Sequence, residues 1–290
     1  MRSDPIKSLN RLNDVTDLKT ESRKMNPMSI NPEQSELEIA FCRATLYSAL
    51  ALGFRPPTEE TVARLATPQN AAALGQAAAL LDIDGKLAFV SLVQAVAHAG
   101  TVGTAALMAS YRALFGHTVR GPIPPYETEY GNEALFQQPQ EMGDLMGFYR
   151  AFGLSVKVDG HERCDHISCE CEFLSFLALK EAYGLEHRDL EMVQQSRKAI
   201  RLFLRDHLGR FLPAFAGKLR REDRAGFYSM LAQLCLAFIE LESNRFDVPR
   251  GTASLGLRPA DDDRIPMACG SGAECAALPG ACAPEGADSV

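Results

Sequence analysis

The feature that most constrains this chain is a series of windows rich in alanine and leucine, each ended by glycine or proline. From Pro32 onward, apolar residues such as Leu37, Phe41 and Ala44 recur at spacings of three and four. That spacing gathers them on one face of a helix. Gly53 then ends the first window, because glycine favours helix termination. The pattern favours helix over sheet and predicts an all-α fold.

The same pattern continues to about residue 243 and predicts one compact domain of about nine or ten helices over 33–243. Short connections favour antiparallel neighbours. Residues 116–132 are predicted to be a loop, since their prolines and glycines prevent regular hydrogen bonding. The predicted helices lie at about 32–53, 58–65, 69–81, 86–99, 103–115, 139–152, 165–183, 189–208 and 227–243.

Both ends of the chain differ in composition from this domain. Residues 1–32 are polar, with no sustained apolar period, and are predicted to form a disordered N-terminal arm. Residues 244–290 are rich in glycine, proline, aspartate, alanine and serine, and are predicted to form a flexible tail.

Charge and hydropathy exclude several classes of function. The formal charge of −7 argues against nucleic-acid binding, which depends on basic residues. No run approaches the roughly 18–20 apolar residues that span a bilayer, so stable membrane insertion is not expected. The start of the chain lacks the apolar stretch of a secretory signal, and eight cysteines are too few for a disulfide scaffold. These features predict a cytoplasmic protein.

Three short motifs stand in order within the predicted domain. They are Tyr-Arg-Ala-Leu-Phe-Gly at 111–116, Pro-Pro-Tyr-Glu-Thr-Glu-Tyr at 124–130 and Glu-Arg-Cys-Asp-His-Ile at 162–167. Together they resemble the signature of the TorD/DmsD/NarJ family, whose members are cytoplasmic chaperones that mature molybdenum-containing redox enzymes. Two positions depart from the family pattern, with Thr128 in place of the usual serine and Arg163 in place of the usual proline.

The resemblance implies a TorD-like, all-helical chaperone without catalytic activity or a cofactor of its own. Its partner would be the apo catalytic molybdenum subunit of an oxidoreductase, bound through a twin-arginine leader or an N-terminal segment until molybdopterin is inserted. Acids beside aromatic rings can grip an arginine by hydrogen bonds and by stacking. The implied client-binding residues are Tyr126, Glu127, Glu129, Glu162, Asp165 and His166.

The motifs also have plainer interpretations. The tyrosines of the loop could plug the domain while its acids are solvated, and Asp165 could be a helix N-cap, with His166 in the first turn, free to hydrogen-bond to the Tyr126 loop. Glu170 and Glu172 are predicted to form an acidic helix face. Replacing Glu127, Asp165 and His166 together with alanine is expected to abolish client binding without changing melting.

Two alternatives remain open from the sequence. One is a small metal- or cofactor-handling protein that uses His166, Asp165 and cysteines, with Cys269, Cys275 and Cys282 as weak candidate ligands. The two gaps between these thiols in the sequence are wide, which favours cysteines without a metal-binding role. The other is a scaffold subunit that stays in the mature complex. The chain could be a monomer or a homodimer. No phosphate-binding glycine loop or zinc-protease histidine spacing is present.

Overall fold

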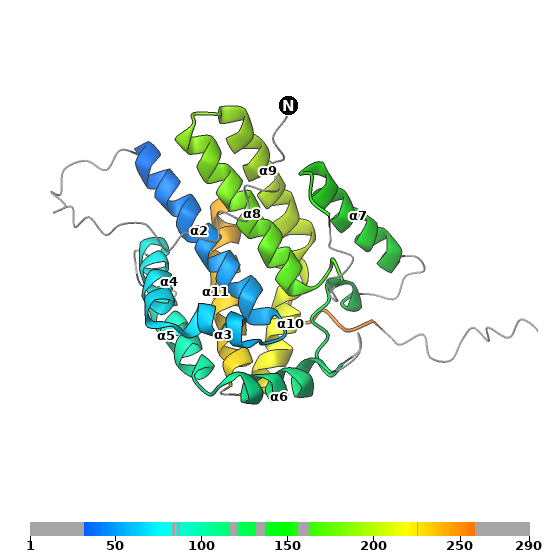
Figure 1. The fold of residues 1–290 in the computed structure, drawn as a ribbon. Helices are drawn as coiled ribbons and strands as arrows, with labels where there is room; N and C mark the ends of the chain where they lie inside the picture. Colours follow the sequence, from blue (N-terminus) through cyan, green and yellow to red (C-terminus); the bar gives the residue numbers. More distant parts are fainter. Residues whose placement is uncertain are drawn as a thin grey trace, which may run out of the picture.

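The computed structural model describes residues 32–82, 85, 88–116, 121–131, 137–155, 163–224 and 226–258. Within these ranges the chain forms ten α-helices, one 3-10 turn and no strand, so the all-α prediction is confirmed there (Figure 1). Residues 1–31 of the predicted N-terminal arm, Glu162 and the three tail cysteines lie outside the described residues, and Pro32 already belongs to the first helix. The elements are α2 (Pro32–Phe54), α3 (Glu59–Ala66), α4 (Pro68–Leu81), α5 (Phe89–Gly100), α6 (Thr104–Phe115), η2 (Glu127–Glu129), α7 (Gln137–Ala151), α8 (Ile167–Glu186), α9 (Leu190–Asp206), α10 (Leu208–Glu222) and α11 (Phe227–Phe246).

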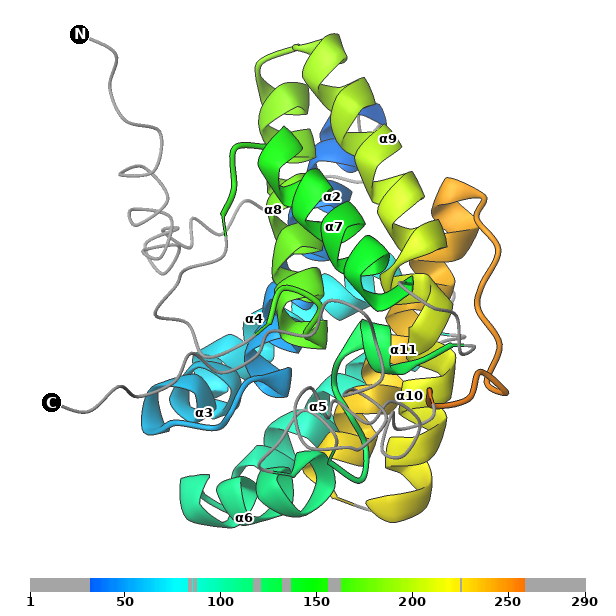
Figure 2. The same ribbon diagram turned by 90° about the vertical axis from the view of Figure 1, so that its right-hand side faces the viewer.

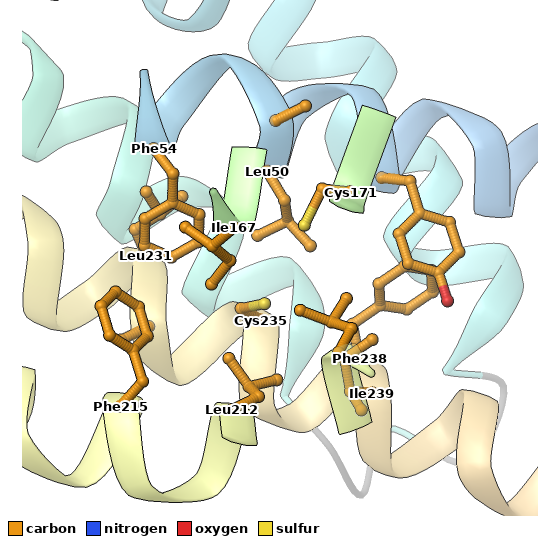
Figure 3. Packing of buried hydrophobic residues seen from close by; sticks show 14 of the residues in the cluster. Leu50, Phe54, Ile167, Cys171, Leu212, Phe215, Leu231, Cys235, Phe238 and Ile239 are labelled. Atoms are coloured by element: carbon orange, nitrogen blue, oxygen red, sulfur yellow. The ribbon is translucent and has the colours of Figure 1, made fainter. Parts of the chain in front are cut away.

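Helices α2 and α8 form the centre of the domain and make its most extensive helix pair. They are antiparallel, since Arg43 in the middle of α2 pairs with Glu181 in the second half of α8, whereas Arg55, just after α2, pairs with Glu172 near the start of α8. The opposite ends of the two helices meet α10 and α11 in the apolar core (Figure 3). The core side chains seen there include Leu50, Phe54, Ile167, Cys171, Leu212, Phe215, Leu231 and Cys235.

Helix α2 contains a window, Ser35–Phe54, that is long and apolar enough by length and composition to cross a membrane. The sequence prediction that no such run exists is therefore wrong. The window contains few charged residues, and its many alanines and leucines raise its mean hydropathy. Most of the window is buried against other helices, as in the core helix of a water-soluble domain.

A buried ionic network ties α2 to three other helices. The Arg43 guanidinium donates to Glu242 from Nε (2.8 and 2.9 Å) and to Glu181 from Nη1 (2.5 Å). Tyr47 also donates to Glu242 (3.0 Å), and Arg197 of α9 donates to Glu181 (2.6 Å). Burial alone would lower the pKa of Arg43, but the two glutamates raise it above its ordinary value, so the guanidinium stays charged.

Helix α10 is the element that the sequence pattern did not predict. Gly209 and Pro213 interrupt it, and an interior proline normally ends or kinks a helix. Because Pro213 has no N–H, the Gly209 carbonyl four residues earlier lacks its helical donor. The N–H of Gly251 supplies one instead (3.0 Å). A Cβ at Gly251 would lie only 1.8 Å from the carbonyl oxygen of Arg210, so this approach requires glycine.

The residues after α11 form an ordered segment, 247–258, which we call the strap. Figure 2 shows it as the orange segment that descends beside α11 and α10. Near its end, Gly131 donates to Gly256 (3.0 Å) and the Arg258 N–H donates to Glu129 (2.8 Å). The predicted flexible tail from 244 therefore starts too early, because α11 runs to Phe246 and the strap packs on the domain.

Candidate functional site

Residues 121–131, the signature loop, connect α6 to α7 and close against the start of α8. Glu127 donates its N–H to the Asp165 carbonyl, and Ile167 donates to the Pro125 carbonyl (both 2.9 Å). These two hydrogen bonds form an isolated antiparallel bridge. The second and third sequence motifs are thus joined through their backbones, which places the predicted site residues of both motifs side by side.

Glu127 attaches the signature loop to α10. Its carboxylate is fully buried and accepts from Arg210 (2.8 Å), while its other oxygen lies 3.1 Å from Nδ1 of His207. Arg210 also approaches Glu141 of α7 (3.5 Å), whose two oxygens accept from Arg258 of the strap (both 2.9 Å). The loop, α7, α10 and the strap therefore meet in one charged cluster.

Asp165 is also fully buried, and an arginine from its own motif neutralises it. It accepts from Nε and Nη2 of Arg163 (2.9 and 2.7 Å) and from the Thr128 hydroxyl (2.7 Å). Arg163 further donates to Glu129 (3.3 Å), and its guanidinium carbon lies 4.8 Å from the Tyr126 ring centroid. We call the four residues around this guanidinium, Tyr126, Thr128, Glu129 and Asp165, the guanidinium pocket.

His166, not Asp165, is the N-cap of α8, so the cap prediction is wrong by one residue. The His166 Nδ1 accepts from the Ser168 N–H (3.1 Å), and its ring lies edge-on to Tyr126 with centroids 5.2 Å apart. Burial, with a smaller contribution from two nearby arginines, lowers the pKa of His166 to about 3. The imidazole is therefore neutral at physiological pH and serves as a hydrogen-bond acceptor.

Glu170 lies one turn into α8 and is fully buried, although the sequence predicted it on an acidic surface together with Glu172. Only Glu172 is exposed, and it pairs with Arg55. Neither carboxyl oxygen of Glu170 has a hydrogen-bond partner among the described residues. Burial, and then the negative charge of Glu127, raise the pKa of Glu170 well above its ordinary value. Its surroundings thus favour the protonated, neutral form of the carboxyl group.

Replacing Glu170 with glutamine should remove a pH dependence of stability. Since the pKa of Glu170 is raised in the folded state above its ordinary value of 4.5, the unfolded chain loses this proton first as the pH rises. Wild type should therefore lose about 1.4 kcal/mol of stability per pH unit relative to Glu170→Gln, until the folded carboxyl ionises too.

Urea unfolding of both proteins between pH 5 and pH 8 would measure this difference. Glu172→Gln, on the exposed face of the same helix, is the matched control and should follow the wild-type profile. Parallel profiles for wild type and Glu170→Gln would show that Glu170 is ionised in the folded protein.

Five of the six predicted site residues gather in the structure, and Glu162 lies outside the described residues. The acids are not solvated, because internal arginines neutralise them. Tyr130 does plug the domain, since it is fully buried and donates to the Pro124 carbonyl (3.0 Å). Sequence reasoning missed the arginine partners: Arg163, which pairs with Asp165, stood within a motif, whereas Arg210, which pairs with Glu127, lies in a helix that the sequence pattern did not predict.

The part of the chain that the structure describes contains no cluster of side chains that would support the alternative of a metal centre. No group of three histidine, cysteine, aspartate or glutamate side chains there could hold a metal ion. None of the described cysteines, at positions 42, 164, 169, 171 and 235, is in a disulfide. Burial, and then the charge of Asp165, raise the pKa of Cys164 to about 11, so this thiol is protonated.

Comparison with known proteins gives one family match, to the nitrate reductase delta subunit, over residues 78–217. The chain is 32% identical over 143 residues to the chaperone protein TorD of Vibrio cholerae (49% of this chain, 62% of the relative). It is 37% identical over 97 residues to the selenate reductase assembly chaperone protein of Thauera selenatis (33% and 46%). It is 31% identical over 109 residues to the perchlorate reductase assembly chaperone protein of Dechloromonas aromatica (36% and 47%).

The chain spans less than two thirds of the length of these relatives. The matched region nevertheless runs from α4 into α10 and contains the signature loop, the guanidinium pocket and both residues that hold Glu127. All three motifs on which the resemblance was based lie inside it. Residues 78–217 of this chain therefore match the nitrate reductase delta subunit family, and the relatives found are reductase assembly chaperones and TorD.

Proposed function

We propose that this protein is an assembly chaperone for the catalytic subunit of a molybdenum-containing oxidoreductase. It binds the apo-subunit through a leader or N-terminal segment and holds it open until the molybdopterin cofactor is inserted. The relatives support this proposal, because TorD and the perchlorate and selenate reductase proteins are chaperones by name. Binding before export or complex assembly would take place in the cytoplasm.

The observation that carries the proposal is the guanidinium pocket. One guanidinium group is surrounded there by a buried carboxylate, a second acid and an aromatic ring. Asp165 accepts two parallel hydrogen bonds from the planar edge of this group. Such a set of contacts recognises arginine rather than lysine, since only arginine offers a planar fork and a flat face. A twin-arginine leader offers a client guanidinium of this kind. The work of the site is binding, and no bond chemistry is needed.

Affinity copurification from the native host, grown under anaerobic respiratory conditions, tests the proposal. Mass spectrometry should find a molybdopterin-binding catalytic subunit, and cofactor analysis should show that this subunit lacks its cofactor. Persistent one-to-one recovery with cofactor-loaded enzyme would instead identify a scaffold subunit. Recovery of the protein alone with stoichiometric zinc or iron would favour metal handling.

A double variant at the pocket, Tyr126→Leu with Glu129→Gln, should reduce client recovery at least tenfold. It removes the aromatic platform and one acid, each of which contributes about 0.5–2 kcal/mol to arginine binding, but leaves the buried Asp165 in place. Circular dichroism should show unchanged helix content. Arg245→Ala is the control, because Arg245 pairs with Glu36 at the opposite end of the domain; equal recovery from both variants would remove the pocket from the proposal.

A further inference from the structure

We propose that Arg163 is an exchangeable resident ligand of the guanidinium pocket, which a client arginine displaces. This inference rests on the proposed function and adds a regulation of that site. In the free protein, Arg163 makes the contacts that the pocket would offer to a client: two hydrogen bonds to Asp165, one to Glu129, and a stacked position over Tyr126. The chain thus carries its own competitor.

Exposure and position in the backbone together indicate which of the paired arginines can leave. The Arg163 side chain is 31% exposed, whereas the Asp165 side chain beneath it is fully buried. The pocket therefore reaches the surface at the guanidinium. Arg258 is only 6% exposed. Arg210 is 27% exposed, but it lies in the first turn of α10 and is held by two carboxylates, one from the loop and one from α7. Arg163 lies in the turn before α8 and is in no helix.

The burial of Asp165 explains why the free protein needs such a ligand. Leaving a buried carboxylate without its cation costs about 3–5 kcal/mol. The pocket is therefore most stable when it holds a guanidinium, and before a client arrives only the chain itself can supply one. Exchange of one guanidinium for another keeps the ion pair and costs little. The backbone of the turn need not move, since the Arg163 carbonyl accepts from the His166 N–H (3.1 Å) whichever way the side chain points.

A client arginine can enter the pocket only while Arg163 is out of it. The apparent affinity for a client is therefore the intrinsic affinity multiplied by the fraction of time for which the pocket is open. If Arg163 is out of the pocket for about a tenth of the time or less, removing it should tighten binding about tenfold or more. Lysine at this position can pair with Asp165 only as a point charge, without the planar fork. The affinity should therefore rise in the order wild type, Arg163→Lys, Arg163→Ala.

Isothermal titration calorimetry of the full chain with a synthetic peptide measures this order. The peptide carries two adjacent arginines followed by an apolar segment, and the control peptide has lysines in their place. Arg245→Ala is the control protein, because Arg245 is a similarly exposed arginine in an ion pair, near the end of α11. It should bind the arginine peptide as wild type does, and the lysine peptide should bind each protein more weakly.

Tighter binding of the arginine peptide by Arg163→Ala supports the inference, and equal or weaker binding overturns it. Binding by neither protein also overturns it, while the copurification experiment reads the chaperone function independently.

A measurement on the wild-type protein covers the case in which the variant does not fold. In arginine-labelled protein, the Arg163 Nε–H resonance should shift to that of a solvated side chain when peptide is added, and an unchanged resonance contradicts exchange.

Discussion

Replacing Arg43 with alanine is expected to lower the free energy of unfolding by about 3–5 kcal/mol. Arg43 supplies the positive charge between two fully buried glutamates, Glu181 and Glu242. Without it, Glu181 keeps Arg197, but Glu242 keeps only the Tyr47 hydroxyl. A buried carboxylate with so few partners must either take up a proton or draw water into the core, and both cost stability.

Urea unfolding followed by far-ultraviolet circular dichroism would measure the loss. Arg245→Ala, which breaks a partly exposed ion pair at the end of α11, should cost no more than about 1 kcal/mol. A second variant separates charge from packing: Arg43→Met with Glu242→Leu removes both charges and should recover much of the lost stability. A loss of less than 1 kcal/mol for Arg43→Ala would mean that the network is open to water.

Replacing Glu127, Asp165 and His166 together with alanine is expected to unfold the domain or bring it close to unfolding. Each carboxylate is fully buried and holds the signature loop, so its removal costs about 1–3 kcal/mol. Loss of the His166 N-cap adds about 1 kcal/mol. The total approaches the roughly 5–15 kcal/mol that stabilises a whole domain. The sequence-based expectation of unchanged melting is thus reversed by burial.

Thermal melting and helix content by circular dichroism would test this reversal. The matched control replaces Glu222, Asp144 and His98 with alanine, the same three residue types at exposed positions, and should melt near wild type. If the buried triple variant melted like this control, the three side chains would not hold the loop, and any loss of client binding in that variant would reflect lost contacts with the client.

The helices were largely predictable, because glycine and proline ended most of them where the sequence indicated. Helix α10 was the exception, since Pro213 and its neighbouring glycines look like a break. What lets the helix continue is a hydrogen bond to the carbonyl of Gly209 from the strap. No local pattern contains that information, because donor and acceptor are far apart in the sequence.

The residues of the site could be predicted from the sequence, but the burial of their side chains could not. The motifs named five residues that do lie together, yet charged residues are usually exposed, so their acids were expected at the surface. Their neutralising partners decide otherwise. Arg210, which pairs with Glu127, comes from the helix that was not predicted, and Arg258, which pairs with the neighbouring Glu141, comes from a segment predicted to be flexible. Errors about these two distant elements hid the charged cluster around Glu127.

The pairing of the strap with the signature loop has a consequence for the order of biosynthesis. Tyr130 and Leu257 form a bridge, so the loop is finished only by residues made much later in the chain. During synthesis, segments nearer the N-terminus fold first, and contacts between distant residues form late. On the ribosome the loop therefore stays incomplete until Arg258 has emerged. The client binding that we propose therefore requires the finished domain, and it cannot begin before the strap has been synthesised.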